Sequence, residues 1–538
     1  MNNHTVCVRR VRVAAVILLM AYCSCSAYAR DLTKRSWSTK ILVYCFEASP
    51  TGFDPNQYEA TPDYTVAATV FNRLLEYRRG NINKIEPSLA ERWEISEDGR
   101  RYTFHLRRGV KFHTTPWFKP TREFNAEDVL FTFERMRNPN MPFYKAYPVE
   151  FPDFQRDGLQ HVITKIEALD DYTVRFTLNT VYAPFLANMT MPFASIISAE
   201  YAQQLLKAGK LSEINQKPVG TGPFIFQKYN KDSVIYFGGN PAYWKPEDVR
   251  LSKLTFSITR DAAVRAQKLI KNECQVSAAV RPIDIASLRK APHLRILSQQ
   301  GFNMGFLAYN VTHKPLNDVR VRRALDMAID KKAIINAVFQ GRAQAAVAPM
   351  PPLQWGYDKS LKDTPRDLKQ ARKLLAQAGY PNGFTLSLWA MPIQRPHSPN
   401  GRLTAEMIQS DWRKIGVKAK ILTYDWGEYL ARADKGEHDA LLIGWISNTN
   451  DPDEWLEAVR FSHWHNKTFD DLLQKAKRTI DIAQRTQLYL KAQKVFKREQ
   501  PFTPIAYATD YQVINKRVTG FKINPLGPTV FSGVGLAE

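Results

Sequence analysis

The chain has no recognisable signature of a catalytic site. It contains no G-x-S-x-G elbow, no Walker phosphate loop, no H-E-x-x-H zinc motif and no C-x-x-C pair. It also has no apolar run approaching the roughly 18 residues of a membrane span. These absences exclude the commonest hydrolase, nucleotide-binding and integral membrane classes, so we expect a protein that is not an enzyme. A peptide hydrolase is kept as the alternative from a different class.

Cysteine is scarce, with 5 in 538 residues. Cys7, Cys23 and Cys25 fall in an N-terminal segment that is typical of an export signal. Cys45 and Cys274 remain, and such a pair in an oxidising compartment forms either one disulfide or two buried free thiols. The residues by themselves leave both alternatives open.

The N-terminus has the three parts of a secretory signal. Arg9, Arg10 and Arg12 precede an apolar run over residues 13–21, and the small-x-small site 27–29 follows. We predict a signal peptide over residues 1–29 and a periplasmic location. Tyr22 stands where lipidation requires a small residue before Cys23, so no lipid anchor is expected.

Positive charge is in excess but is not clustered. The chain has 75 Lys and Arg against 52 Asp and Glu, a formal net charge of +23. Basic residues are scattered over the whole chain, and no nucleic-acid-binding module is recognisable. We interpret the excess as a basic solvated surface and expect no nucleic-acid partner.

A chain of this length needs two or three domains. The first half alternates apolar and polar residues around the turns Asp98-Gly99 and Asp170-Asp171, which predicts antiparallel strands, with a helix capped by Asn125 between them. The second half predicts helices opened by Asp318 and Asp367 and then strands over 384–388, 417–422 and 440–445 separated by helices. This alternation indicates α/β packing, with ligands expected in a crevice between two lobes.

Two loops that follow predicted strands are candidate binding elements. Residues 395–400 form a proline-bounded loop in which Arg395 could hold a carboxylate through two parallel hydrogen bonds. Residues 444–453 form a Gly-, Asn- and Pro-containing turn in which Trp445 offers an apolar face. His463 and His465 are the only close histidine pair, and without an apparent third ligand no metal site is expected.

The chain resembles the extracellular solute-binding proteins of family 5, the peptide-binding components of ABC importers, and within them the dipeptide-binding and Sap-type proteins. The resemblance rests on ordered blocks at residues 43–53, 87–94, 104–112, 117–122, 125–129, 218–223, 240–244, 321–325 and 395–430. It implies a two-lobed periplasmic-binding-protein fold, type II, cluster C, with an extra subdomain in the first lobe. The implied domains are lobe I over 30–299, with the subdomain at about 80–215 and completed by 513–538, and lobe II over 300–512.

The resemblance also implies roles for individual residues. Cys45 and Cys274 match a disulfide of the dipeptide-binding group, and Arg395 matches the arginine that holds the ligand carboxylate. The family places an acid for the ligand ammonium where this chain has Asn448, so Asp451 or Asp453 could substitute for it. A loop near residues 461–465 is shorter than in relatives and lacks their additional disulfide.

The resulting prediction is a monomeric periplasmic binding protein without a cofactor or metal. It captures a di- or oligopeptide-like ligand by lobe closure and delivers it to an ABC permease, using Arg395, Trp445, Asn448 and Asp451. Haem, a polyamine or an antimicrobial peptide is the alternative ligand. The net charge favours anionic haem or acidic peptides over polycations.

Overall fold

The computed structural model describes residues 40–537, and its largest element is a mixed sheet of twelve strands. The predicted signal peptide and its three cysteines lie outside the described residues. The order along the sheet is β16-β15-β17-β13-β18-β11-β1-β10-β9-β8, and β12 and β14 pair with β18 off this path. The strand bounds are β1 (Ile41–Phe46), β8 (Phe224–Asn230), β9 (Val234–Gly239), β10 (Lys253–Ile258), β11 (Val276–Ser277), β12 (Leu294–Gln300), β13 (Asn303–Tyr309), β14 (Ala343–Ala345), β15 (Thr385–Trp389), β16 (Lys418–Leu422), β17 (Ala440–Ile446) and β18 (Phe502–Asn515).

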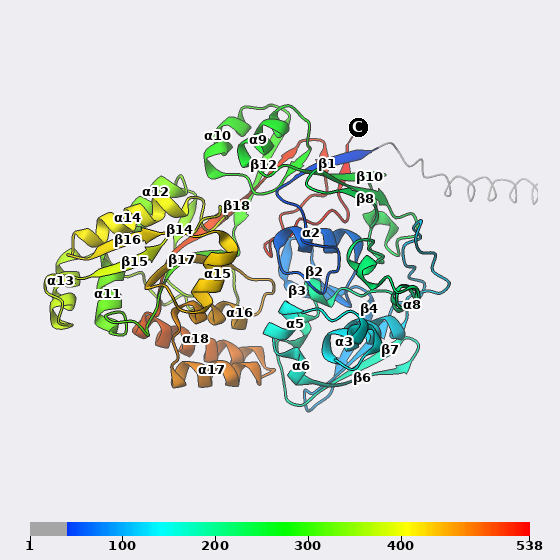
Figure 1. Ribbon diagram of the computed structural model, residues 1–538, viewed down its shortest axis with the longest axis horizontal. Coiled ribbons are helices and arrows are strands. Elements are labelled where there is room, and N and C mark those ends of the chain that lie inside the picture. The colour runs from blue at the N-terminus through cyan, green and yellow to red at the C-terminus, as the bar shows by residue number, and fades with distance from the viewer. Residues whose placement is uncertain (1–39, 538) are drawn as a thin grey trace, which may run out of the picture.

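Strand β18 joins two lobes, as Figure 1 shows. Its first residues pair with β13 and its last residues pair with β12. The chain also crosses between β12 and β13 at Gly301, whose N–H donates to the carbonyl of Ala508 at 3.0 Å. A Cβ on Gly301 would lie 2.2 Å from that carbonyl oxygen, so the two crossing segments can pack together only with glycine there. The lobes are thus joined by two adjacent extended segments.

Lobe II packs helices on a sheet that contains parallel strand pairs. β15 pairs in parallel with β16 and β17, and β17 pairs antiparallel with β13. Asp318 and Asp367 cap helices by accepting hydrogen bonds from Arg320 and Gln370 backbone amides, as predicted. The helices are α11 (Val319–Ala328), α12 (Lys331–Val338), α13 (Leu368–Gln377), α14 (Gly401–Arg413), α15 (Trp426–Asp434), α16 (Pro452–Leu456), α17 (Lys467–Lys477) and α18 (Ile482–Glu499).

Lobe I contains a separate four-stranded antiparallel sheet in the order β4-β5-β7-β6. The predicted turns at Asp98-Gly99 and Asp170-Asp171 connect its hairpins, and Asn125 forms a capping box with Asp128 at the start of α3. The remaining strands and α-helices are β2 (Leu75–Arg78), β3 (Asn81–Pro87), β4 (Ala90–Ile95), β5 (Arg101–Leu106), β6 (Ile163–Asp170), β7 (Thr173–Leu178), β19 (Val518–Thr519), β20 (Gly535–Leu536), α2 (Thr61–Val70), α3 (Ala126–Arg137), α4 (Pro142–Ala146), α5 (Pro152–Arg156), α6 (Leu159–Val162), α7 (Phe185–Asn188), α8 (Ala199–Ala208), α9 (Ala262–Ile270) and α10 (Ile285–Arg289).

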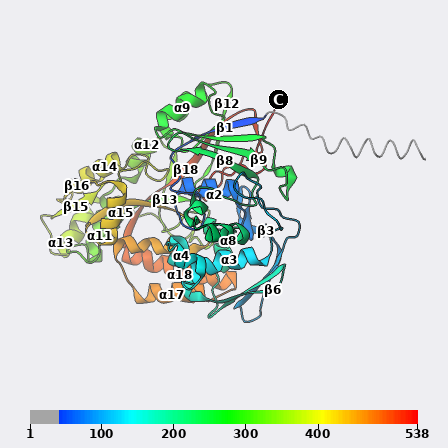
Figure 2. The ribbon, with the colours of Figure 1, turned by 45° about the vertical axis from the view of Figure 1, so that its right-hand side comes forward.

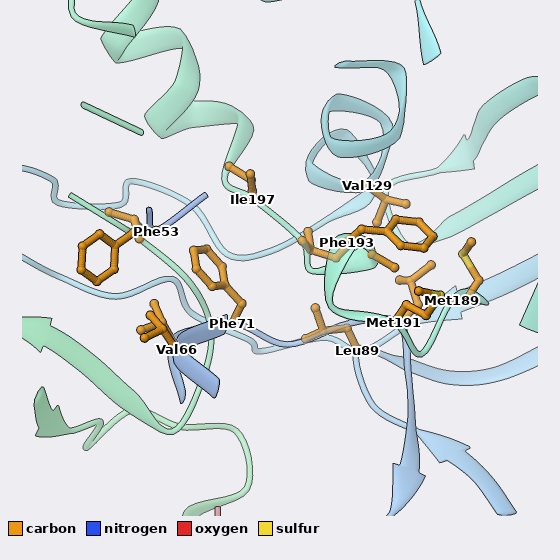
Figure 3. Packing of buried hydrophobic residues seen from close by; sticks show 14 of the residues in the cluster. Phe53, Val66, Phe71, Leu89, Val129, Met189, Met191, Phe193 and Ile197 are labelled. Atoms are coloured by element: carbon orange, nitrogen blue, oxygen red, sulfur yellow. The ribbon is translucent and has the colours of Figure 1, made fainter. Parts of the chain in front are cut away.

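The hydrophobic cores follow the two lobes. One large cluster joins residues between 42 and 278 with residues 514–534, and it includes the packing around Phe71, Leu89 and Phe193 in Figure 3. Two other clusters are built almost entirely from residues 302–508. Each lobe therefore has a core of its own. Burying each large apolar side chain in such a core contributes about 1.5–3 kcal/mol to the stability of the fold. The exact boundaries near 299 and 512 stay a prediction.

Cys45 and Cys274 form a disulfide, with their Cα atoms 5.7 Å apart. They lie in a small core between β1 and helices α9 and α10. Figure 2 shows α9 above β1. The predicted pairing is therefore confirmed, and the free-thiol alternative is wrong. Over residues 40–537, none of the helices has the length and apolar character needed to cross a bilayer.

Candidate functional site

A cavity of about 450 Å³ lies beside β18 and takes its walls from both lobes. Lobe I contributes Tyr44 and Glu47 of the β1 region, the start of α9, and residues 278–282 and 523–529. Lobe II contributes residues 393–396 and Ile446, while β18 contributes residues 508–512. A concave site between two lobes that are joined by extended crossings is suited to capturing a small ligand by closure.

Arg395 lies in the wall of this cavity, in the loop between β15 and α14. Its backbone exchanges two hydrogen bonds with Ser398, at 3.1 and 3.0 Å, which closes the loop into a tight turn. Its guanidinium donates only a long bond of 3.5 Å to the carbonyl of Gln394 among the described residues. The turn therefore presents a positive charge with free donors to the cavity, as carboxylate binding requires.

His397 packs this turn against the sheet. A Cβ on Gly444 of β17 would lie 2.0 Å from the His397 ring, and a Cβ on Gly305 of β13 would lie 2.4 Å from the His397 carbonyl oxygen. Burial, with a smaller contribution from Arg395, lowers the pKa of His397 to about 3, so the ring is neutral. Two glycines on adjacent strands thus allow the Arg395 turn to lie directly on the sheet.

The other arginines of the cavity wall have protein partners. Arg265 donates to four backbone carbonyl oxygens at 2.7–3.2 Å. Arg260 pairs with Asp232 at 2.6 Å, and Arg342 donates to the carbonyl of Pro282 at 3.3 Å. Of the arginines in this wall, Arg395 has the weakest internal bonding, so it is the cation best placed to bind a ligand.

Three acids in the wall, Glu47, Asp261 and Asp510, were not found from the sequence. Burial raises the pKa of Glu47, and the guanidinium groups of Arg395 and Arg265 act against that rise. Asp510, on β18, accepts a hydrogen bond from Asn303 at 3.0 Å, and burial raises its pKa to about 7. The cavity therefore carries both signs of charge, which suits a ligand that is itself zwitterionic.

Asn448 lies in a second, smaller cavity of about 100 Å³. Arg73, Glu76 and Lys522 line the same cavity, and burial lowers the pKa of Arg73 while it raises that of Glu76. Residues 523 and 524 line both cavities. Arg395 and Asn448 are therefore in neighbouring cavities rather than in the wall of one.

The loop that carries Asn448 is organised around the half-buried carboxylate of Glu454. This carboxylate accepts hydrogen bonds from the Ser447 hydroxyl at 2.6 Å and from the Asn448 and Thr449 amides at 3.0 and 3.1 Å. The next residue, Asn450, reaches lobe I, where its side chain donates to the Ile82 carbonyl at 3.0 Å. This loop is consequently part of the contact between the lobes.

Asp451 ends this loop and does not line either cavity. It caps α16 by accepting from the Asp453 amide at 3.1 Å and pairs with Arg485 at 2.8 Å in a buried site. Asp453 is likewise buried and pairs with Lys477 at 3.0 Å. The structure therefore gives both acids internal partners, and their contact with a ligand stays a prediction.

Trp445 is also absent from both cavity walls. Its ring packs on the opposite side of β17, 6.1 Å from the Phe461 ring and 5.4 Å from the Arg460 guanidinium. Side chains alternate along a strand, so Ile446 rather than Trp445 faces the larger cavity. The sequence shows that side chains alternate along this strand, but it does not show which face of the strand lines the cavity.

The histidine pair lies in the turn that follows a short helix. His463 adopts a left-handed backbone conformation at the end of a short helix, and its Nε2 lies 3.1 Å from the Ala433 carbonyl oxygen. Within residues 40–537, no group of three or more His, Cys, Asp or Glu residues is placed to hold a metal ion.

Comparison with known proteins identifies the family. The model of "Bacterial extracellular solute-binding proteins, family 5 Middle" matches residues 84–467. The chain is 55% identical to Di/tripeptide-binding protein 1 of Pseudomonas aeruginosa, over 92% of this chain and 94% of the relative. It is 40% identical to Heme-binding protein A of Haemophilus influenzae, over 97% and 98%.

A solved structure confirms the predicted fold. The dipeptide-binding protein of Pseudoalteromonas sp. SM9913, in complex with Met-Leu, superimposes with a TM-score of 0.84 at 36% identity, covering 92% of this chain and 100% of that one. The two-lobed α/β fold of type II periplasmic binding proteins is therefore confirmed. The chain belongs to the bacterial extracellular solute-binding proteins, family 5, a family of substrate-binding transport proteins.

Proposed function

We propose that this protein captures di- or tripeptides outside the cytoplasm and delivers them to an ABC permease. The observation that carries the proposal is the cavity of about 450 Å³ between the lobes, in which the Arg395 guanidinium is left free to bind a carboxylate. The relatives named for di/tripeptide and dipeptide binding support the ligand class.

The capture mechanism is closure of the lobes about the two crossing segments at Gly301 and Ala508. A ligand held by Arg395 from lobe II and by groups of lobe I favours the closed form, because it contacts both lobes only when they are closed. The closed form then docks on the permease. We infer that the protein is exported through the segment 1–29 and acts as a monomer without a lipid anchor.

Calorimetric titration of the purified protein with a small set of dipeptides and tripeptides tests this function. We expect binding with a Kd in the micromolar range or below and a decrease in the radius of gyration on binding. Haem is titrated in parallel, because one full-length relative is named as a haem-binding protein. Binding of haem with no binding of any peptide would contradict the proposal, as would release of free amino acids from the peptides.

A further inference from the structure

Glu47 and Arg395 line the larger cavity from opposite lobes. Glu47 directly follows β1 of lobe I, whereas Arg395 lies in the turn after β15 of lobe II. Within residues 40–537 the Glu47 carboxylate makes no hydrogen bond or ion pair, and the Arg395 guanidinium makes only its long bond to Gln394. They are close enough for Arg395 to favour the ionised form of Glu47.

The remaining acids of the wall are already engaged. Asp261 caps α9 by accepting a hydrogen bond from the Val264 amide at 2.8 Å. Asp510 accepts one from Asn303 at 3.0 Å. Glu47 is therefore the acid of the wall without an internal partner, and Arg395 is the base with the weakest internal bonding. The two residues belong to different lobes.

We propose that Glu47 binds the α-ammonium group of the captured peptide while Arg395 binds its carboxylate, an assignment that rests on the proposed function. An ionised carboxylate in a partly desolvated site is costly without a counter-charge, and the ligand ammonium supplies one on binding. A zwitterionic ligand then bridges the lobes, so both of its charged ends contribute to closure.

This arrangement also accounts for a neutral residue at position 448. The Asn448 side chain lies in the smaller cavity, and the carboxylate beneath it, Glu454, is occupied by the amides and hydroxyl of its own loop. With Glu47 as the acidic partner, a second acid at 448 is not needed to bind the ammonium group.

The test is calorimetric titration with alanyl-leucine and with N-acetyl-alanyl-leucine, which keeps the carboxylate and lacks the ammonium. For the wild-type protein we expect acetylation to weaken binding at least tenfold. Glu47→Gln keeps the shape of the side chain and removes its charge, so we expect at least tenfold weaker binding of the free dipeptide and nearly equal binding of the two ligands.

Glu273→Gln is the matched control, because Glu273 is an exposed acid of lobe I that lines neither cavity. We expect it to change the affinity for the free dipeptide less than threefold. The inference is overturned if Glu47→Gln retains the wild-type preference for the free dipeptide, or if Asp510→Asn abolishes that preference instead. Wild-type protein that binds no dipeptide would instead contradict the proposed function.

A crystal structure of the wild-type protein with alanyl-leucine gives an answer that needs no variant. We expect the peptide nitrogen to lie about 2.7–3.2 Å from a Glu47 carboxylate oxygen. A nitrogen bound by Asn448 or Asp510 instead would overturn the assignment.

Discussion

The two loops that follow β15 and β17 use their polar groups in opposite ways. The Arg395 turn packs a neutral His397 against glycine-bearing strands and leaves its charged group free toward the cavity. The 447–451 loop engages several of its polar groups internally, through Glu454, Arg485 and the contacts of Asn450 with lobe I. The difference teaches that only the first loop leaves a charged group available, which agrees with our proposal that Arg395 binds the ligand, whereas the second loop holds the structure together.

The largest expected effect concerns the structural loop. Asp451→Ala removes one partner of a buried ion pair and leaves Arg485 without it, so we expect the free energy of unfolding to fall by about 3–5 kcal/mol. Arg395→Ala should change it by less than about 0.5 kcal/mol, because the guanidinium has little internal bonding. Urea denaturation measures both, and equal losses for the two variants would remove the distinction between the loops.

Gly444→Ala tests how closely the Arg395 turn approaches the sheet. Its new Cβ would overlap the His397 ring, so we expect a loss of about 1–3 kcal/mol in stability and weaker peptide binding as the turn is displaced. Gly427→Ala is the matched control, since a Cβ there meets no atom within 4 Å in helix α15, and a gain of up to about 1 kcal/mol is expected. A neutral Gly444→Ala would contradict the packing argument.

Arg395→Ala is expected to weaken binding of peptides with a free carboxylate at least tenfold, or about 1.4 kcal/mol. Calorimetry with a dipeptide and its C-terminal amide makes the measurement specific. The variant should bind the two ligands almost equally, whereas the wild-type protein should prefer the free acid. An unchanged affinity would show that another group holds the carboxylate.

The stability of the protein is also expected to depend on pH. The pKa of His397 is about 3 in the folded protein, below the ordinary value of 6.5, so the folded state binds fewer protons than the unfolded state between these values. Its contribution to stability is present above pH 6.5 and is lost as pH falls toward 3, by at most about 1.4 kcal/mol per pH unit.

His397→Asn removes this contribution without adding a charge. The stability of the wild-type protein relative to this variant should therefore decrease on acidification. A difference between the two proteins that does not vary from pH 7 to 4 would contradict a buried neutral histidine under the Arg395 turn.

Local patterns were sufficient to predict many elements. Asn125, Asp318 and Asp367 cap the helices that they were expected to begin, because capping depends on a few neighbouring residues. The pairing of Cys45 with Cys274 followed from the resemblance and agrees with the cysteine count. Arg395 was proposed as a ligand residue, and the structure places it in a cavity wall.

The rest of the candidate site could not be predicted in this way. Trp445 and Ile446 are equally apolar neighbours on β17, and only the packing of the sheet decides which of them meets the cavity. Asp451 has the chemistry of an ammonium ligand, but its pairing with Arg485 depends on where α18 lies. Glu47 carried no local signal at all.

The sequence by itself determined the α/β class, the helix starts and the family resemblance, and it predicts the export segment. These features depend on short-range patterns and ordered blocks of residues. Only the tertiary structure decided which charges remain free. That outcome depends on the partners each side chain finds across the fold: Arg265 meets backbone carbonyls and Asp451 meets Arg485, whereas Glu47 and Arg395 face one cavity from two lobes.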